Sequence, residues 1–202
     1  RVLGSTPSKI AGQINSNGNV MLVNPNGVFL TKSGVVKSNS FTASSLEINT
    51  SDFLQGRHSF FKSGKSKGVE NHGKVEVNNF GHASLLGNYV SNEGVITAKF
   101  GKIFLGAGEQ ITLDLSGNDL MKITVPTSEL SHIKDINGKS LDSLVTNNGS
   151  LIADGGYVQL SARTAETLML GAVNVGSSGV ISTASIDPVS YTHLTLPTIL
   201  LV

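Results

Sequence analysis

The sequence predicts an all-β protein: a right-handed parallel β-helix from which β-hairpins project. Three observations lead to this fold class. A short sequence template recurs in phase, a second strand-like element follows its first three copies, and the composition is rich in glycine and poor in charge. Repeats of about 20–45 residues that stack on their neighbours are typical of solenoids. We therefore expect short strands that stack coil upon coil.

The recurring template is Val-x-Asn-x-Gly-x-φ-x-φ, in which φ is an apolar or small residue. The alternation after the glycine predicts a short strand with one apolar face, and the glycine predicts a corner. The glycines of the first two copies, Gly73 and Gly94, are separated by one coil of about 20 residues. The copies begin at Val69, Val90, Val145 and, in a weaker form, Val175.

Stacking the coils in this phase places equivalent residues over one another. Val75, for example, would lie over Ile96 in the interior. The template asparagines would meet at a corner, where side-chain amides can form a hydrogen-bonded ladder. We predict a structural rather than a catalytic role for the ladder, which consists of Asn71, Asn92 and Asn147.

Further strands are predicted on either side of the template. A second element begins at Gly81, Gly101 and Gly156, each followed by alternating apolar residues. Toward the start of the chain, residues 18–22 match the Gly-x-φ-x-φ half of the template. Alternating apolar residues over 40–54 predict more strand.

Two segments interrupt the repeat. Residues 57–68 are basic and rich in glycine and serine, which predicts a protruding hairpin or loop. An insertion separates Gly94 from Gly149, and within it two alternating segments, 110–115 and 120–125, flank a turn and predict a β-hairpin. Residues 128–134 are predicted to form a short helical turn.

The stretch Asn24-Pro25-Asn26-Gly27 lies between two apolar segments and predicts a tight turn. Proline fixes φ at the second position, and Asn26 and Gly27 both tolerate positive φ. The side chain of Asn24 can accept a hydrogen bond from the backbone N–H two residues on, which closes an Asx-turn. Turns of this kind occur in many folds, so spacing alone gives them only a weak functional meaning.

Composition and charge exclude several classes of function. A net charge of +1 gives no electrostatic argument for nucleic acid or an anionic membrane as a partner. The chain has no cysteine, which excludes thiolate metal sites and disulfides. The histidines His58, His72, His82 and His132 show no metal-ligand spacing, and we expect His72 and His82 to be exposed. No metal or cofactor is predicted.

Both ends of the chain depart from the rest. The chain opens on Arg1 without an initiator methionine or a signal peptide, so we expect that it is a fragment. Residues 189–202 resemble the in-frame translation of a sequencing-library adapter, and we expect the native sequence to end near Pro188. The apolar tail is shorter than the roughly 20 residues that a membrane span requires.

The ordered set of motifs along residues 1–186 resembles the two-partner secretion domain of filamentous haemagglutinin-like exoproteins. The most specific block is 17–28, Asn-Gly-Asn-Val-Met-Leu-Val-Asn-Pro-Asn-Gly-Val. In this family Asn-Pro-Asn-Gly is a signature, which the resemblance assigns to Asn24, Pro25, Asn26 and Gly27. Further matching blocks are 1–4, 8–12, 45–48, 52–56 and 111–117.

The resemblance implies that residues 1–188 are a partial secretion domain at the N-terminus of a large exoprotein or adhesin. Such a domain is recognised by an outer-membrane β-barrel transporter through its periplasmic domains. It then folds outside a Gram-negative cell. Host-surface receptors would be bound through a C-terminal region beyond this chain. The signal peptide and the first strands of the family, which cap the helix, are absent from the sequence.

Two other classes of function remain open at this stage. Parallel β-helices also include polysaccharide lyases and hydrolases, whose sites gather acidic and basic residues on one face of successive coils. Here the outer positions are mostly Ser, Thr, Asn and Lys, so we expect no enzyme. The fragment could instead be an adhesive module in its own right. A groove lined by carboxylates would favour the enzyme, and a smooth coil would favour the secretion domain.

Overall fold

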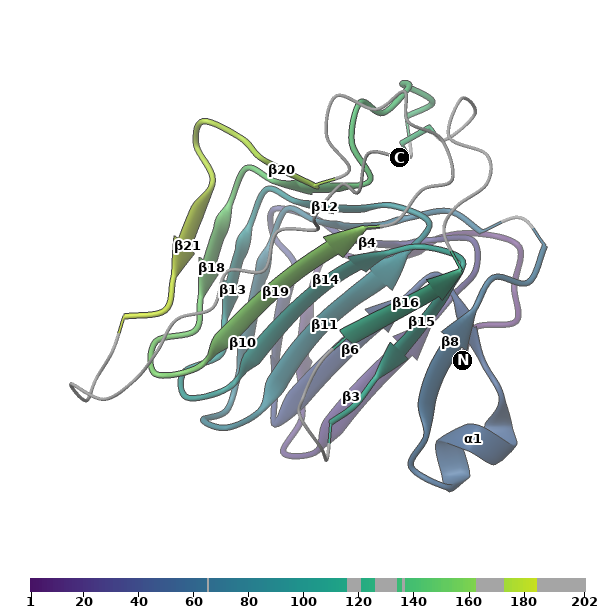
Figure 1. The fold of residues 1–202 in the computed structure, drawn as a ribbon, viewed down its shortest axis with the longest axis horizontal. Helices are drawn as coiled ribbons and strands as arrows, with labels where there is room; N and C mark the ends of the chain where they lie inside the picture. Colours follow the sequence, from purple (N-terminus) through teal and green to yellow (C-terminus); the bar gives the residue numbers. More distant parts are fainter. Residues whose placement is uncertain (65, 116–120, 126–133, 136, 163–172, 185–202) are drawn as a thin grey trace, which may run out of the picture.

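The chain winds into a parallel β-helix, in which successive coils stack along one axis (Figure 1). The computed structural model describes residues 1–64, 66–115, 121–125, 134–135, 137–162 and 173–184. Its coils supply strands to three parallel sheets, which we call sheets A, B and C. The predicted class, an all-β parallel β-helix, is confirmed. None of the described helices is long and apolar enough to cross a membrane.

Sheets A and B contain short strands that pair with the equivalent strands of the neighbouring coils. The predicted register is observed, because Val75 of sheet B pairs with Ile96 of the next coil. Sheet A consists of β1 (Ser8–Ile10), β4 (Val28–Leu30), β9 (Val69–Asn71), β12 (Val90–Asn92), β17 (Val145–Asn147) and β20 (Val173–Val175). Sheet B consists of β2 (Gln13–Asn15), β5 (Val35–Ser38), β10 (Lys74–Val77), β13 (Val95–Thr97), β18 (Ser150–Ile152) and β21 (Val180–Ser182).

Sheet C has longer strands and buries much of both its faces. Leu85 and Leu105 point into the coil and join the main apolar core, whereas Leu86 and Phe104 point outward into a second buried cluster. Alternation in a strand permits this, since successive side chains lie on opposite faces. Sheet C consists of β3 (Asn19–Val23), β6 (Ser40–Ser44), β11 (His82–Gly87), β14 (Lys102–Ala107) and β19 (Tyr157–Ala162).

A four-stranded antiparallel sheet, sheet D, covers part of the outer face of sheet C (Figure 1). Two excursions supply it, and both leave the helix at the corner between sheets C and A, after the second and fourth coils. The predicted hairpin over 110–125 is confirmed by the antiparallel pairing of its two strands. Sheet D consists of β7 (Glu47–Ile48), β8 (His58–Phe61), β15 (Gln110–Leu113) and β16 (Met121–Val125).

The edge of sheet D is paired to the helix by a side chain. Gln159 of β19 accepts a hydrogen bond from Met121 N at 2.8 Å and donates one to Met121 O at 2.9 Å. The amide therefore imitates a neighbouring strand and satisfies the backbone groups of an edge. Beside it, Gly106 of β14 leaves room for the Met121 sulfur, because a Cβ at this position would lie 2.3 Å from it. These contacts fix the position of sheet D on the outer face of sheet C.

Two predictions about the first excursion are right for part of the segment and wrong for the rest: 62–64 and 66–68 are loop as expected, and β6 and β7 are strands within 40–54. The segment 57–68 contains a strand, β8, and Phe60 within it is fully buried and pairs with Ile111. Its partner lies in the second excursion, some 50 positions away in sequence, so local composition could not reveal the pairing. The predicted strand over 40–54 ends in a short helix, α1 (Thr50–Leu54), which Asn49 precedes with an extended backbone.

One further prediction is wrong, and two fall wholly or almost wholly on residues outside those that the structure describes. Residues 18–22 do not belong to the template, because β3 pairs with β6 in sheet C rather than with sheet B. Both elements share the same alternation, so alternation alone cannot assign a strand to its sheet. The helical turn predicted over 128–134 falls almost wholly on residues outside those that the structure describes. Residues 189–202 also lie outside them, and their non-native origin stays a prediction.

Candidate functional site

The Asn24–Gly27 turn joins β3 of the first coil to β4 of the second. Asn24 Oδ1 accepts a hydrogen bond from Asn26 N at 3.0 Å, so the predicted Asx-turn is present. Gly27 N donates to Asn24 O at 2.9 Å and closes a β-turn. Of the two residues expected to tolerate positive φ, only Gly27 adopts it, at 104°.

The asparagine side chains of the turn bind the segment that precedes β1. Asn24 Nδ2 donates to Thr6 O at 3.0 Å and to Ser8 Oγ at 2.9 Å. Asn26 Nδ2 donates to Gly4 O at 2.8 Å. These bonds satisfy the backbone carbonyls of Gly4 and Thr6 and engage the hydroxyl of Ser8. The turn therefore holds the first described segment of the chain against the first coil.

On its other side the turn contacts the start of the third coil. Lys67 N donates to Pro25 O at 3.0 Å, and Val28 N donates to Gly68 O at 3.2 Å. A Cβ on Gly27 would lie 3.2 Å from Gly68 O, closer than most side-chain contacts. The chain returns here from the first excursion, so the turn also marks the point at which the helix resumes.

Burial limits what the turn can do in the folded protein. The side chain of Asn24 is fully buried, whereas those of Pro25 and Asn26 are partly exposed. A partner that binds the folded chain can reach Pro25 and Asn26 but not Asn24. Asn24 is thus a structural residue of the folded coil: its amide oxygen and amide nitrogen both bond within the chain.

The predicted asparagine ladder is present at the corner between sheets A and B. Asn71 Nδ2 donates to Asn92 Oδ1 at 2.7 Å, and Asn92 Nδ2 donates to Asn147 Oδ1 at 2.7 Å. All three side chains are buried. The glycine two residues on is equally specific, because a Cβ on Gly94 would lie 2.1 Å from Gly73 O. Asparagine and glycine together make a corner that repeats without change.

The ladder ends where the corner lengthens, a feature that the sequence analysis missed. Leu30 and Val175 occupy the ladder position in the second and sixth coils, since each pairs in register with a ladder asparagine. Their corners are two residues longer than the Asn-x-Gly corner and close by backbone turns, Gly34 N to Thr31 O and Gly179 N to Gly176 O. The weak template copy at Val175 is therefore out of phase: Val173, not Val175, pairs with Val145.

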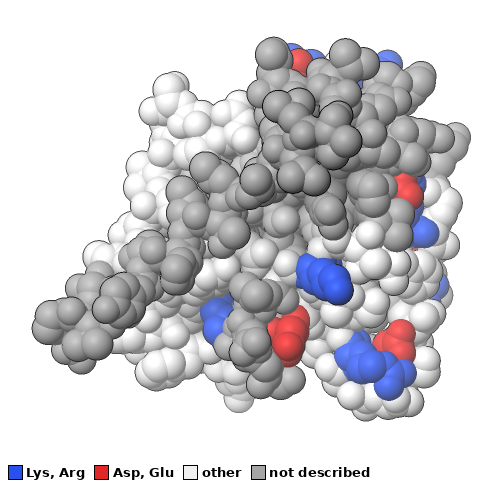
Figure 2. All heavy atoms as spheres, in the orientation of Figure 1, with Lys and Arg blue, Asp and Glu red and all other residues white. Residues whose placement is uncertain are grey.

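The outward positions of the coils show no repeated column of acids in the described strands. In sheet A the outward column runs Lys9, Phe29, Glu70, Ser91, Thr146 and Asn174, with one carboxylate. In sheet B, Glu76 is the one acid among the outward positions of the paired residues. On the face shown in Figure 2, charged side chains of both signs are scattered.

A polar recess does occur over sheet A, with a volume of about 310 Å³. Four carboxylates line it, from Glu70, Glu93, Asp135 and Asp142. Glu70 accepts a 2.6 Å hydrogen bond from Tyr89 Oη, and His72 lies 3.3 Å from Glu70 and 2.8 Å from Glu93. Asp135 accepts hydrogen bonds from the backbone N–H groups of Asn137 and Lys139. No group of three or more acidic, histidine or cysteine side chains suited to a metal ion occurs among the described residues. The expectation that His72 is exposed is wrong, because its ring packs on Phe29 at 5.0 Å between centroids.

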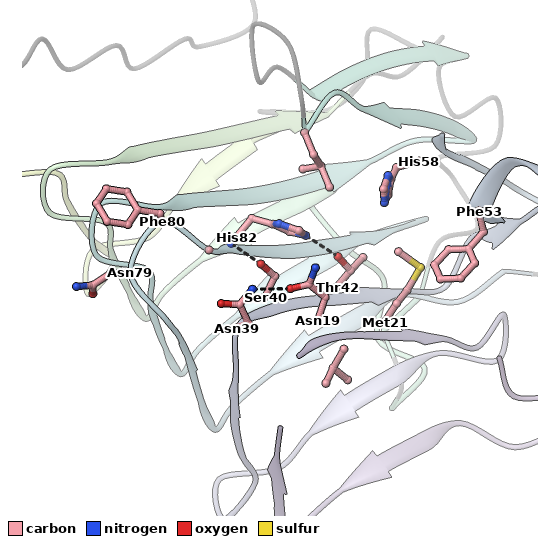
Figure 3. A pocket seen from close by; sticks show the side chains of 13 residues that line it. Asn19, Met21, Asn39, Ser40, Thr42, Phe53, His58, Asn79, Phe80 and His82 are labelled. Atoms are coloured by element: carbon pink, nitrogen blue, oxygen red, sulfur yellow. Dashed lines mark hydrogen bonds between the residues drawn. The ribbon is translucent and has the colours of Figure 1, made fainter. Parts of the chain in front are cut away.

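The expectation that His82 is exposed is also wrong. Its Nε2 lies 3.3 Å from Thr42 Oγ1, and its backbone N–H donates to Ser40 Oγ at 3.1 Å (Figure 3). Burial, together with the nearby charges of His58 and Lys102, lowers the pKa of His82 to about 4. Burial lowers the pKa of His58 as well. His132 lies outside the described residues.

With this geometry established, comparison with known proteins identifies relatives. A family model described as the TPS secretion domain matches residues 1–188. The crystal structure of the HMW1 secretion domain from Haemophilus influenzae superposes with a TM-score of 0.65 at 27% identity, covering 91% of this chain and 51% of that one. The haem/hemopexin-binding protein of Haemophilus influenzae is 33% identical over 129 residues, which cover 59% of this chain and 14% of that protein.

Proposed function

Since the chain belongs to the TPS secretion domain family, we propose that it is the segment through which a larger exoprotein is recognised and exported. The proposed partner is a dedicated outer-membrane β-barrel transporter of a Gram-negative bacterium. The observation that carries this proposal is the match of residues 1–188 to the family. The chain spans about half of the similar crystallised secretion domain and about a seventh of the curated relative. The export of a larger exoprotein and its binding partners are therefore part of the proposal.

We propose that the periplasmic domains of the transporter bind the chain while it is extended. An extended segment can add itself as a strand to the edge of a partner's sheet, and backbone hydrogen bonds then provide affinity. The strands of sheets A and B suit this mode, because each has only a few residues and one apolar face. The absence of cysteine supports it as well, since no disulfide can block threading.

The exported chain then folds coil by coil at the cell surface. The strand order supports this step, because sheets A and B run in the order of the chain and each coil pairs with those directly before and after it. Each new coil therefore requires mostly contacts with a coil that has already formed. A folded coil cannot re-enter the transporter, which would bias movement outward.

The role of the Asn24–Gly27 turn in secretion is proposed to be structural. Its buried asparagine and its bonds to the segments before and after it support this role. The turn would start the stack, and the extended strands would be what the transporter recognises. The chain is proposed to have no enzymatic activity, since the described outward columns of sheets A and B do not form a repeated acidic face and Glu70, Glu93 and Asp135 of the recess are bonded within the chain. Host-surface binding is proposed for parts of the exoprotein beyond this chain.

The test is capture of the chain by the purified periplasmic domains of the cognate transporter. Wild type, Asn24→Ala and Asn26→Ala would be compared, with Asn15→Ala, an exposed asparagine of the first coil, as the control. Each protein would be presented both folded and freshly diluted from urea. If the turn is structural, the urea-diluted variants are captured like wild type, but their secretion from cells falls. Loss of capture for the extended variants would show direct recognition of the turn. Failure of wild type to be captured in either state would overturn the proposed function.

A further inference from the structure

Part of the outer face of sheet C is left uncovered by sheet D and forms a cleft (Figure 3). We call it the sheet C cleft. Its floor is formed by the first halves of β3, β6 and β11, and one wall is formed by α1 and β8 of the first excursion. Its volume of about 760 Å³ lies within the range of small-molecule sites.

The floor of the sheet C cleft is polar but carries no formal charge. Ser40 and Thr42 are buried beneath it, and their hydroxyls bond to His82. The imidazole of His82 and the exposed amides of Asn19 and Asn39 line it as well. Asn39 Nδ2 donates to Asn19 Oδ1 at 2.8 Å. This bond does not use the amide nitrogen of Asn19. None of the described residues that line the cleft is Asp, Glu, Lys or Arg, and Lys102, which pairs with His82 on β14, lies outside this lining. Because the pKa of His82 is about 4, its ring is neutral at pH 7.

Aromatic rings stand at the two ends of the cleft, Phe80 at one and Phe53 at the other (Figure 3). Phe80 is 79% exposed and Phe53 is 47% exposed. One face of Phe80 stacks on Phe100 of the next coil, with centroids 5.5 Å apart and planes 25° from parallel. The stack holds the ring in place without burying it.

The corner at Phe80 requires a positive φ, but nothing in the corner requires a phenylalanine there. Phe80 has φ 66° and Phe100 has φ 53°, a region that side chains other than Asn, Asp and Gly seldom adopt. In the next coil Gly155 adopts the same conformation, with φ 68°. A glycine would therefore serve the corner without strain. An exposed phenylalanine in its place loses stability and leaves apolar surface in water, as functional sites do.

We propose that the sheet C cleft binds a neutral oligosaccharide of two or three residues. Sugar hydroxyls both donate and accept hydrogen bonds, so they match the exposed amides of Asn19 and Asn39 and the imidazole of His82. The apolar C–H face of a sugar ring stacks on an aromatic ring, which gives Phe80 its role. The lack of charged lining residues selects against uronic acids and other charged sugars, because their carboxylates would lose water without gaining an ionic partner. This inference does not depend on recognition by a transporter.

The test is saturation-transfer NMR and calorimetric titration of the purified chain with maltotriose, cellotriose and triacetylchitotriose. Trigalacturonic acid is the charged comparison. At least one neutral trisaccharide should bind, about tenfold or more tightly than the acid. Phe80→Asn should weaken that binding by about tenfold, since asparagine tolerates the left-handed backbone but offers no ring. Asn39→Ala, at an exposed rim position, should weaken it severalfold and provides a second variant that keeps the corner intact.

Val180→Asn is the control, because it also replaces an exposed apolar side chain by asparagine, and Val180 does not line the cleft or touch the stacked rings. It should change binding by no more than about threefold. The proposal is overturned if no neutral trisaccharide binds, or if Val180→Asn and Phe80→Asn weaken binding equally. Capture by the periplasmic domains of the transporter should be the same for Phe80→Asn and wild type. Loss of that capture would instead make the cleft part of the transporter interface and would also overturn the proposal.

Discussion

Two corners of the β-helix use asparagine in different ways. At the corner between sheets A and B, the ladder residues Asn71, Asn92 and Asn147 bond to one another from coil to coil. At the corner between sheets C and A, Asn24 and Asn26 bond instead to the backbone of the segment that precedes β1. The ladder is a repeated part, whereas the turn is a junction.

The two corners differ in which hydrogen-bonding groups lose their partners when an asparagine is replaced. In the ladder each amide pairs with another amide, so replacing the whole column strands no side-chain amide. It does remove the bonds that the ladder makes to the backbone of the corner glycines Gly73, Gly94 and Gly149. In the turn the partners are mostly backbone groups of Gly4, Thr6 and Asn26, which no substitution can remove. An unpaired buried polar group costs more than a hydrogen bond contributes. The junction should therefore be less tolerant than the repeat.

The largest effect is expected from Asn24→Leu. The substitution removes both donor bonds and the acceptor of the Asx-turn in a fully buried position, and the remaining backbone groups lose their partners. The free energy of unfolding should fall by about 3–4 kcal/mol. Urea unfolding followed by circular dichroism measures it. A loss below about 1 kcal/mol would mean that the first segment is held by other contacts.

A smaller loss is expected from Asn92→Leu in the middle of the ladder. The Asn71 amide nitrogen loses its acceptor and the Asn147 amide oxygen loses its donor, because both bond to Asn92. The free energy of unfolding should fall by about 2 kcal/mol. The triple replacement of Asn71, Asn92 and Asn147 by Leu should cost less than three single losses, because no side-chain amide remains stranded and only the bonds to the corner backbone are lost. Additive losses in the same urea titration would show that the ladder is a set of independent residues.

Gly27→Ala should cost about 1–2 kcal/mol. Gly27 has a φ of 104°, and its Cβ would approach Gly68 O. Gly12→Ala is the control, because a Cβ there would meet nothing within 4 Å and the backbone does not have positive φ. The thermal midpoint of Gly12→Ala should match that of wild type. Equal shifts for the two variants would show that the junction places no special demand on its glycine.

The same comparison explains how much the sequence could predict. The ladder and the register of sheets A and B could be predicted, because their partners repeat in phase and Asn71 points to Asn92 by position alone. The Asx-turn at Asn24 was predictable from local chemistry. Its partners Thr6 and Lys67 were not, since a backbone carbonyl or amide carries no sequence signal.

The excursions were harder to predict for a related reason. Sheet D pairs strands from two insertions, and its contacts are with outward residues such as Leu86 and Phe104. Alternation identifies such residues as apolar but cannot say that a distant segment covers them. The sheet C cleft lies at the limit of this cover, so its lining comes from both the repeat and the first excursion. A site of this kind forms where an insertion covers only part of the repeat, so it cannot be found from the repeat alone.

The smallest effect is expected where the ladder could be extended. Val175 occupies the ladder position in the last described coil, is 43% exposed, and has a corner two residues longer than the template. Val175→Asn combined with deletion of Ser177 and Ser178 would restore the Asn-x-Gly corner and give the Asn147 amide a side-chain acceptor. The gain in unfolding free energy should be about 0.5–1 kcal/mol.

Val175→Asn without the deletion separates the two requirements. The longer corner closes by its own backbone bond from Gly179 N to Gly176 O, so the new amide would have no glycine two residues on to complete the repeat. Its stability should stay within about 0.5 kcal/mol of wild type. If the single substitution stabilises the protein as much as the shortened variant does, corner length does not decide where the ladder ends. Because the amide and the two-residue corner are expected to act as a unit, only the combined change should make the last coil resemble the three before it.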